Sequence, residues 1–170
     1  MARKVFFSFH YEHDVWRVGQ VRNSWLLQKG ETNTFMDAAD WEAVKKRGDV
    51  AVKAWIDRQL HGTGVTIVLI GTYTAKRDYV MYEIEQSYKR GNGLLGIHIN
   101  RIKNNKKRIS QKGKNPLDYV EVEKKESFLF FTNTYRYKLS ELFKTYDWVL
   151  DDGRKNIGAW IEDAAQRAGR

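Results

Sequence analysis

Two carboxylates on one predicted helix are the side chains whose chemistry depends most on where they point. Glu83 and Glu85 lie between Arg77 and Arg90, a stretch that predicts a helix ending at Gly91. Residues two apart on a helix differ by about 200° in direction, so the two cannot act as a paired acid and base in one cleft. Lys89 can pair with Glu85 on the exposed surface, but Glu83 has no basic partner at helical spacing. Periodicity leaves Glu83 as either an ordinary surface glutamate or a carboxylate at a crevice rim.

A second group of polar side chains follows the first apolar run of the chain. Lys4 to Phe9 predicts a buried strand, and Ser8, His10 and Tyr11 stand near its carboxyl end. Open α/β sheets bind ligands at that edge. His10 and His13 could share a metal ion, but no carboxylate or cysteine pattern completes a set of ligands. We therefore expect no metal site.

Well-known phosphate sites are not encoded in this sequence. It contains neither a G-x-x-x-x-G-K-[ST] loop nor a G-x-G-x-x-G fingerprint. A phospho-accepting receiver domain would need an acidic cluster after its first strand and an aspartate after its third. The corresponding residues here are Ser8-Phe9-His10 and Ile70-Gly71-Thr72, so this class is also disfavoured.

Strands alternate with helices along the chain, which predicts an α/β fold with a largely parallel sheet. We expect a flavodoxin-like domain in which five strands run in the order 2-1-3-4-5 with helices on both faces. In that order the crevice lies between the first and third strands, where the loops 10–14, 37–41 and 71–76 converge. The expected strands are 4–9, 33–36, 65–70, 94–99 and 146–150, and the expected helices are 14–28, one around 50–57, 77–90 and 156–167.

The 170 residues fit a single domain, with a basic, loop-rich insertion at about 101–127. Residues 128–131 could form an edge strand or part of a hairpin. Much of the formal net charge of +9 lies between Arg101 and Lys114, where no acidic residue occurs. This segment lacks the interleaved aromatic residues of a single-strand-binding surface, so a nucleic-acid partner is disfavoured. The chain has no cysteine, signal-peptide pattern or membrane-length apolar stretch, and we expect a cytoplasmic protein.

Several motifs occur together in an order that resembles one family. This combination is similar to the TIR-like domain family of bacterial Thoeris antiphage defence (ThsB), and the resemblance spans nearly the whole chain. The motifs are Phe6-Phe7-Ser8-Phe9-His10-Tyr11, Phe35-Met36-Asp37-Ala38 with Trp41-Glu42, Val68-Leu69-Ile70-Gly71-Thr72, Tyr79-Val80-Met81-Tyr82-Glu83-Ile84 and the closing Tyr146-Asp147-Trp148-Val149-Leu150-Asp151-Asp152-Gly153.

The resemblance implies an enzyme that cleaves the nicotinamide–ribose bond of NAD, with Glu83 as its catalytic residue. NAD would be the substrate, and no cofactor is expected. The product implied is a cyclic ADP-ribose isomer, a second messenger that activates a separate, ThsA-like effector. The residues expected to bind substrate are Ser8, Phe9, His10, Tyr11, Asp37, Trp41, Gly71, Thr72 and Tyr82.

Each of these assignments has a structural alternative. Phe9 and Trp41 could be core residues, Asp37 could cap a turn, and His10 could be an ordinary loop residue. The whole chain has an alternative too, namely a non-catalytic TIR-like interaction module that works by self-association, because a fold alone does not fix function.

Overall fold

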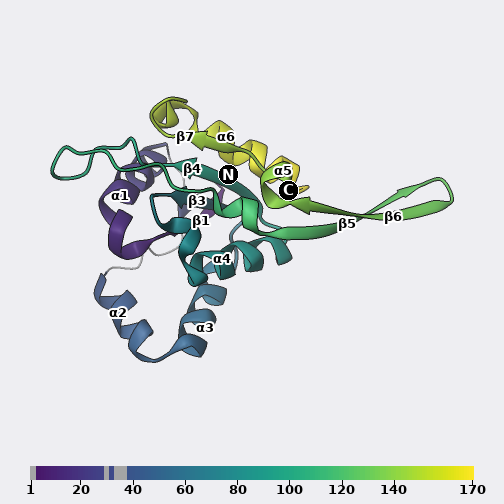
Figure 1. Cartoon of the computed structure of the whole chain (residues 1–170), viewed down its shortest axis with the longest axis horizontal. Coiled ribbons are helices and arrows are strands. Elements are labelled where there is room, and N and C mark those ends of the chain that lie inside the picture. Colours follow the sequence, from purple (N-terminus) through teal and green to yellow (C-terminus); the bar gives the residue numbers. More distant parts are fainter. Residues whose placement is uncertain (1–2, 29–30, 33–37) are drawn as a thin grey trace.

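A computed structural model describes residues 3–28, 31–32 and 38–170 (Figure 1). The elements alternate between strands and helices as far as β4, and a long hairpin then precedes the last strand and helix. In chain order they are β1 (Lys4–Phe9), α1 (Tyr11–Leu27), β2 (Glu31–Thr32), α2 (Ala38–Lys46), α3 (Asp49–Leu60), β3 (Val65–Ile70), η1 (Thr74–Lys76), α4 (Asp78–Lys89), β4 (Gly93–His98), η2 (Pro116–Tyr119), β5 (Glu121–Phe128), β6 (Phe131–Lys138), α5 (Leu139–Leu142), β7 (Thr145–Asp147) and α6 (Gly153–Arg167).

The central sheet has the order β2-β1-β3-β4-β7, and every pair in it is parallel. Because β2 contains only two residues, four strands of three or more residues carry the sheet. The α/β, flavodoxin-like class and the predicted strand order are confirmed. The ends of β1 and β3 therefore lie side by side, with Phe9 opposite Leu69.

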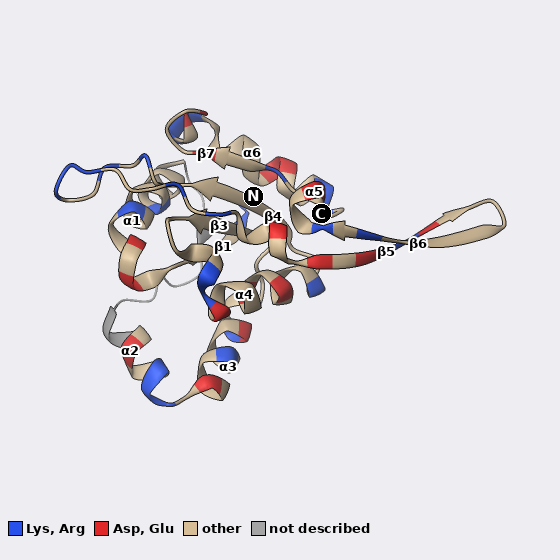
Figure 2. Cartoon of the chain, viewed as in Figure 1, with Lys and Arg blue, Asp and Glu red and all other residues tan. Residues whose placement is uncertain are grey.

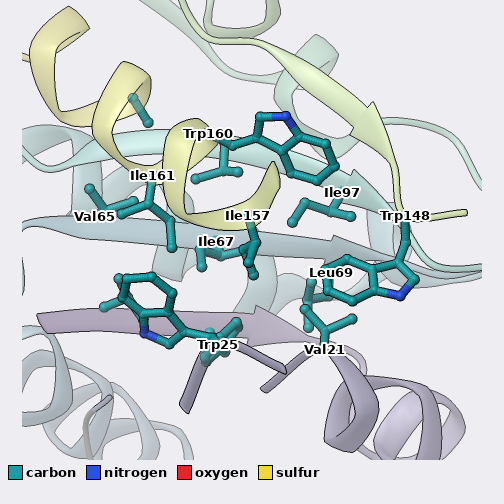
Figure 3. Packing of buried hydrophobic residues seen from close by; sticks show 14 of the residues in the cluster. Val21, Trp25, Val65, Ile67, Leu69, Ile97, Trp148, Ile157, Trp160 and Ile161 are labelled. Atoms are coloured by element: carbon teal, nitrogen blue, oxygen red, sulfur yellow. The ribbon is translucent and has the colours of Figure 1, made fainter. Parts of the chain in front are cut away.

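Helices cover both faces of this sheet, and the alternation of side chains along each strand decides which helix each residue meets. Val5 and Phe7 of β1 point into the cluster formed with α1 and α6, which includes Trp25 and Trp160 (Figure 3). Phe6 points to the other face, where it packs against α3. Ser8 lies on that same face, which is also covered by α4.

Two predicted strands differ from the observed ones. The second strand was expected at 33–36, but β2 is Glu31–Thr32 and the expected residues lie outside the described part of the chain. The last strand was expected to run to Leu150, which is wrong because β7 ends at Asp147. There the Asp147 carboxylate accepts hydrogen bonds from the backbone N–H groups of Val149 and Leu150, each at 3.0 Å, and this local capping turns the chain.

Two helices begin earlier than the sequence predicted. In addition, two helices, α2 and α3, lie where the sequence predicted one. α1 begins at Tyr11 and α6 at Gly153, a few residues before the predicted starts. The region expected to form one helix around 50–57 belongs to α3, and a separate α2 precedes it. Gly48 divides the two with a φ of +93°, a conformation that favours glycine.

The segment after β4 contains more regular structure than the sequence predicted. Residues 101–115 contain no helix or strand, but residues 121–127, expected to be loop-rich, lie in β5. β5 pairs with β6 in a separate antiparallel sheet that projects from the body of the molecule (Figure 1). Aromatic and β-branched residues such as Tyr135, Tyr137 and Thr134 favour the extended backbone of β6. Residues 128–131 form the tip of this hairpin.

Positive charge is concentrated in the long connection between β4 and η2, which forms a blue loop next to α1 (Figure 2). Arg17 fixes this loop by donating hydrogen bonds to the backbone oxygens of Ile102 and Arg108 at 2.8 and 3.2 Å. Within the part of the chain that the structure describes, no helix is long and apolar enough to cross a bilayer.

The close contact between α6 and β4 yields a test of the fold. A Cβ atom added at Gly93 would lie 2.5 Å from the carbonyl carbon of Ala164, so Gly93→Ala would force backbone to move. We expect a loss of about 1–3 kcal/mol in the free energy of unfolding, measured by urea denaturation. Gly19→Ala is the matched control, since nothing lies within 4 Å of an added Cβ there. It should stabilise α1 by up to about 1 kcal/mol. Equal stabilities of the two variants would contradict the close packing of α6 on β4.

Candidate active site

A pocket of about 190 Å³ opens beside the carboxyl half of β1, between that strand and the helices α2, α3 and α4. Most of its lining is aromatic or aliphatic, with a few polar groups, which is the usual composition of a small-molecule site. The lining residues are Val5, Phe6, Phe7, Phe9, His10, Tyr11, Glu12, Trp41, Lys45, Trp55, Arg77, Tyr79, Val80 and Glu83.

Glu83 is the acidic group within the apolar part of this pocket. The residue is only 7% exposed, and its Oε2 accepts a hydrogen bond from the Ser8 hydroxyl at 2.5 Å. Burial raises the pKa of Glu83 from 4.5 to about 8, while the hydrogen bond from Ser8 opposes this shift. No ion pair of Glu83 occurs among the described residues. Without ligand, Glu83 is therefore mainly protonated at neutral pH.

The position of Glu83 follows from how α4 attaches to the sheet. Val80 and Ile84 of α4 pack into the apolar cluster over β3. The Ser87 hydroxyl donates to the backbone oxygen of Glu83 at 2.6 Å, and it also lies 2.7 Å from Oγ1 of Thr66 on β3. These contacts fix the rotation of the helix, so that Glu83 faces β1 rather than solvent. The surface-glutamate interpretation is thus wrong.

Aromatic rings form one continuous wall of the pocket. Tyr11 lies between Phe9 and Trp41, with ring centroids 5.6 and 6.1 Å away. Trp41 also contacts Tyr79 edge-on at 5.8 Å and Trp55 at 6.3 Å. These separations are typical of packed aromatic pairs, and the exposed ring faces could stack on a flat heterocycle.

Two cationic side chains lie among the lining residues, in different electrostatic settings. Lys45 pairs with Glu12 and Glu42, each at 2.8 Å. Arg77 is exposed, precedes α4, and forms no ion pair with the other described residues. Its guanidinium is the cation better placed to receive an anionic group of a ligand.

The structure brings together several residues that the sequence predicted as a site. Phe9, His10, Tyr11 and Trp41 line the pocket together with Glu83. Ser8 is not part of the lining surface, but it reaches the site through its hydrogen bond to Glu83.

Other predicted residues lie elsewhere. The Tyr82 hydroxyl donates to Oδ2 of Asp57 at 3.1 Å, and Tyr82 is not among the lining residues. The Thr72 hydroxyl donates to the backbone oxygen of Gln111 at 2.7 Å, and Gly71 packs next to it against the same basic loop. Neither lines the pocket. Asp37 lies outside the described residues.

The sequence prediction omitted several lining residues, and for two of them, Tyr79 and Val80, helical spacing could have indicated a place in the site. Tyr79 and Val80 precede Glu83 by four and three positions, so all three share a helix face. Trp55 and Lys45 had no comparable signal, because the approach of α2 and α3 to β1 is a tertiary contact.

A further polar cluster adjoins the pocket at the start of α1. The His10 ring stacks parallel to that of His13, with centroids 5.9 Å apart. Burial and the nearby charge of Arg77 lower the pKa of His10. The carboxylate of Asp14 lies next to both rings, so the structure supplies the acidic group that the sequence pattern did not reveal.

The raised pKa of Glu83 predicts a specific pH dependence of stability. Because the folded pKa of about 8 exceeds the unfolded value of 4.5, Glu83 favours folding below pH 4.5, and this contribution is lost as pH rises through 8. Wild type should lose roughly 1.4 kcal/mol per pH unit across this window through this group. Glu83→Gln should therefore gain in stability relative to wild type from pH 5 to 8, measured by urea denaturation. Glu85→Gln, which changes an exposed glutamate of the same helix, is the control, and a flat profile for Glu83→Gln would contradict the shift.

Comparisons with known proteins place this chain in a family. A family model described as "Thoeris protein ThsB, TIR-like domain" matches residues 6–104, more than half of the chain. A Bacillus cereus (strain MSX-D12) protein, named "Putative cyclic ADP-D-ribose synthase ThsB1", is 37% identical over 191 residues, covering 95% of this chain and 100% of that protein. The resemblance seen in the sequence motifs is confirmed, and the chain belongs to the TIR-like domain family of Thoeris ThsB proteins.

Proposed function

We propose that this chain is a NAD-consuming, TIR-like enzyme of antiphage defence that releases nicotinamide and makes a cyclic ADP-ribose isomer. The isomer would act as a second messenger for a separate, ThsA-like effector. The observation that carries the proposal is the buried carboxyl group of Glu83, set in an aromatic pocket with Ser8 as its hydrogen-bond donor. The name of the Bacillus cereus relative supports it. In this proposal NAD is a substrate, no resident cofactor takes part, and the enzyme acts as one domain in the cytoplasm.

The unusual pKa of Glu83 suits a cationic substrate. A protonated Glu83 costs little to bury, whereas an ionised one is unfavourable in this pocket. The positively charged nicotinamide ring of NAD would stabilise the carboxylate, so substrate binding would lower the pKa of Glu83 and release its proton to solvent. Substrate would thereby generate the charge on which its own cleavage depends.

Cleavage then needs one carboxylate rather than two. The bond between ribose and nicotinamide breaks with its electron pair going to the ring nitrogen, and neutral nicotinamide leaves without protonation. The ribosyl fragment becomes an oxocarbenium-like cation, which the Glu83 carboxylate stabilises electrostatically. A hydroxyl or ring nitrogen of the same molecule attacks this cation and loses a proton, which closes the ring. Exclusion of water from the pocket favours this outcome over hydrolysis.

The size of the pocket suggests how NAD would lie. At about 190 Å³ it is smaller than the roughly 300–1,000 Å³ of pockets that enclose a drug-sized ligand. It would hold the nicotinamide end against the aromatic wall, and the pyrophosphate would lie at the rim near Arg77.

A non-catalytic interaction module remains the second candidate, and one observation favours it. Phe128, Leu129, Phe130 and Phe131, at the tip of the β5–β6 hairpin, are each at least 74% exposed. Apolar patches of this kind often mark interaction surfaces. An interaction module would not depend on Glu83, so the following experiment separates the two functions.

The catalytic assignment is tested in cells carrying the wild type, Glu83→Gln or Glu85→Gln, before and during phage infection. Mass spectrometry of the small-molecule extract should show nicotinamide and a cyclic ADP-ribose isomer with the wild type. Glu83→Gln should reduce both on the order of 10²–10³-fold, because the transition state loses its counter-charge. Glu85→Gln should match the wild type. Product levels independent of Glu83, with all three proteins equally abundant, would favour the interaction module.

Arg77 offers a separate test of the substrate orientation. Arg77→Ala should raise the KM for NAD about tenfold and leave kcat nearly unchanged, since a charge-assisted hydrogen bond to phosphate contributes about 1.5–3 kcal/mol. Lys76→Ala is the matched control, because Lys76 is an exposed neighbouring cation that does not line the pocket. Steady-state kinetics of nicotinamide release would measure both variants. An unchanged KM for Arg77→Ala would place the pyrophosphate elsewhere.

A further inference from the structure

Three potential metal ligands meet where β1 passes into α1. His10 directly follows β1, and His13 and Asp14 lie in the first turn of α1. One ligand atom from each of the three lies within 4.8 Å of the other two. The spacing of three and four residues from His10 explains this, because such residues share one face of a helix.

The polar atoms of this cluster are incompletely satisfied. His10 is 7% exposed and Asp14 is fully buried. Neither ring nitrogen of His10 has a hydrogen-bond partner in the described structure, and Oδ2 of Asp14 likewise has none. Buried polar atoms rarely remain unpaired, because their desolvation is costly. An electron-pair acceptor between the two side chains would satisfy one ring nitrogen of His10 and Oδ2 of Asp14, while the other nitrogen of a neutral imidazole carries a proton.

We propose that His10, His13 and Asp14 form a binding site for a transition-metal dication, with Zn²⁺ as the best match. Two imidazole nitrogens and one carboxylate oxygen are typical zinc ligands, and three protein ligands leave a fourth tetrahedral position for water or another ligand. Mg²⁺ and Ca²⁺ fit poorly, because both prefer oxygen ligands.

One pair of ligand atoms already lies at nearly the separation of a bound site. Nδ1 of His13 and Oδ1 of Asp14 share a hydrogen bond of 3.0 Å, which a metal ion would replace. Two ligands on a tetrahedral zinc ion with bonds of about 2.0 Å are separated by roughly 3.3 Å, so this pair needs little adjustment. The side chain of His13 is 37% exposed, and its ring packs edge-on against Tyr73 with centroids 5.1 Å apart.

Two neighbours of Asp14, the Gly71 backbone and the Arg17 side chain, affect how this carboxylate could bind an ion. The Gly71 backbone packs against the carboxylate of Asp14, and a side chain at this position would overlap it. Arg17 places Nη1 3.9 Å from Oδ1 of Asp14, but Nε and Nη2 of its guanidinium donate to the backbone oxygens of Ile102 and Arg108. Its charge would weaken metal binding without occupying the ligand atoms.

Metal binding would also affect the neighbouring pocket. His10 lines that pocket, so an ion ligated by His10 would fix the orientation of one wall residue. Occupancy of the ion site and the shape of the pocket would then be coupled. The proposal itself concerns binding alone and does not depend on the reaction proposed for the pocket.

The test uses the full chain without an affinity tag, stripped with a chelator and dialysed against Zn²⁺ in the absence of nucleotide. Elemental analysis should show about one equivalent of Zn²⁺ per wild-type chain. Co²⁺ titration should produce the visible absorption of a four- or five-coordinate ion. His13→Ala should weaken binding of either ion tenfold or more, whereas His61→Ala, which removes an exposed histidine outside the cluster, should bind as wild type does.

Folding of each variant is checked by circular dichroism. Asp14→Asn provides a second variant, and if it fails to fold, the half-exposed His13 decides the outcome by itself. If the wild type binds Zn²⁺ no more tightly than His13→Ala does, the proposed site is wrong. Displacement of Zn²⁺ by an equal concentration of Mg²⁺ would overturn the assigned class of metal. Since no NAD is present, these results stand apart from any failure of the enzymatic proposal.

Discussion

An acidic side chain, buried with no counter-charge from the residues that the structure describes, is the constraint around which this molecule is arranged. Glu83 can occupy its apolar position because it is protonated there and because Ser8 donates a hydrogen bond to it. Both conditions depend on the sheet. Ser8 reaches Glu83 only if β1 presents it on the α4 face, and α4 keeps its rotation through the packing of Val80 and Ile84 and the contact of Ser87 with Thr66. The raised pKa of Glu83 therefore results from the way in which α4 packs against β1.

The pocket and the proposed ion site share His10, so two kinds of chemistry would meet at one strand end. On one side the imidazole lines the pocket together with aromatic rings and Arg77, and on the other it lies next to His13 and Asp14. In flavodoxin-like folds the carboxyl ends of central strands are the usual place for ligands, because the connecting loops diverge there. In this chain the pocket and the proposed ion site both lie at the end of β1.

Local sequence signals predicted the central fold well, since buried parallel strands are continuous apolar runs and their order follows from short crossovers. Such signals could not determine the helical phase of Glu83, which is set by Ser87 and Thr66 on different elements. They indicated a possible hairpin only at 128–131 and missed most of β5 and β6, because these exposed, charged strands resemble a loop in composition. The motif resemblance identified Glu83, but Arg77 and Trp55 enter the pocket only through tertiary packing. The opposite case is the cluster at the start of α1, where the sequence suggested His10 and His13 as a pair but the helical spacing of Asp14 from His10 was not recognised.

The position of β7 has a consequence for how the chain is made. β4 ends at His98, yet the strand that covers its edge begins only at Thr145, after the basic loop and the hairpin. During synthesis on the ribosome, β1, β3, β4 and α4 can therefore assemble the catalytic side first. Meanwhile the edge of β4 and the apolar face later covered by α6 stay open for another 47 residues or more. Unpaired edges and apolar faces are what chaperones bind and what aggregates share, so the nascent protein is most vulnerable just before its last strand emerges.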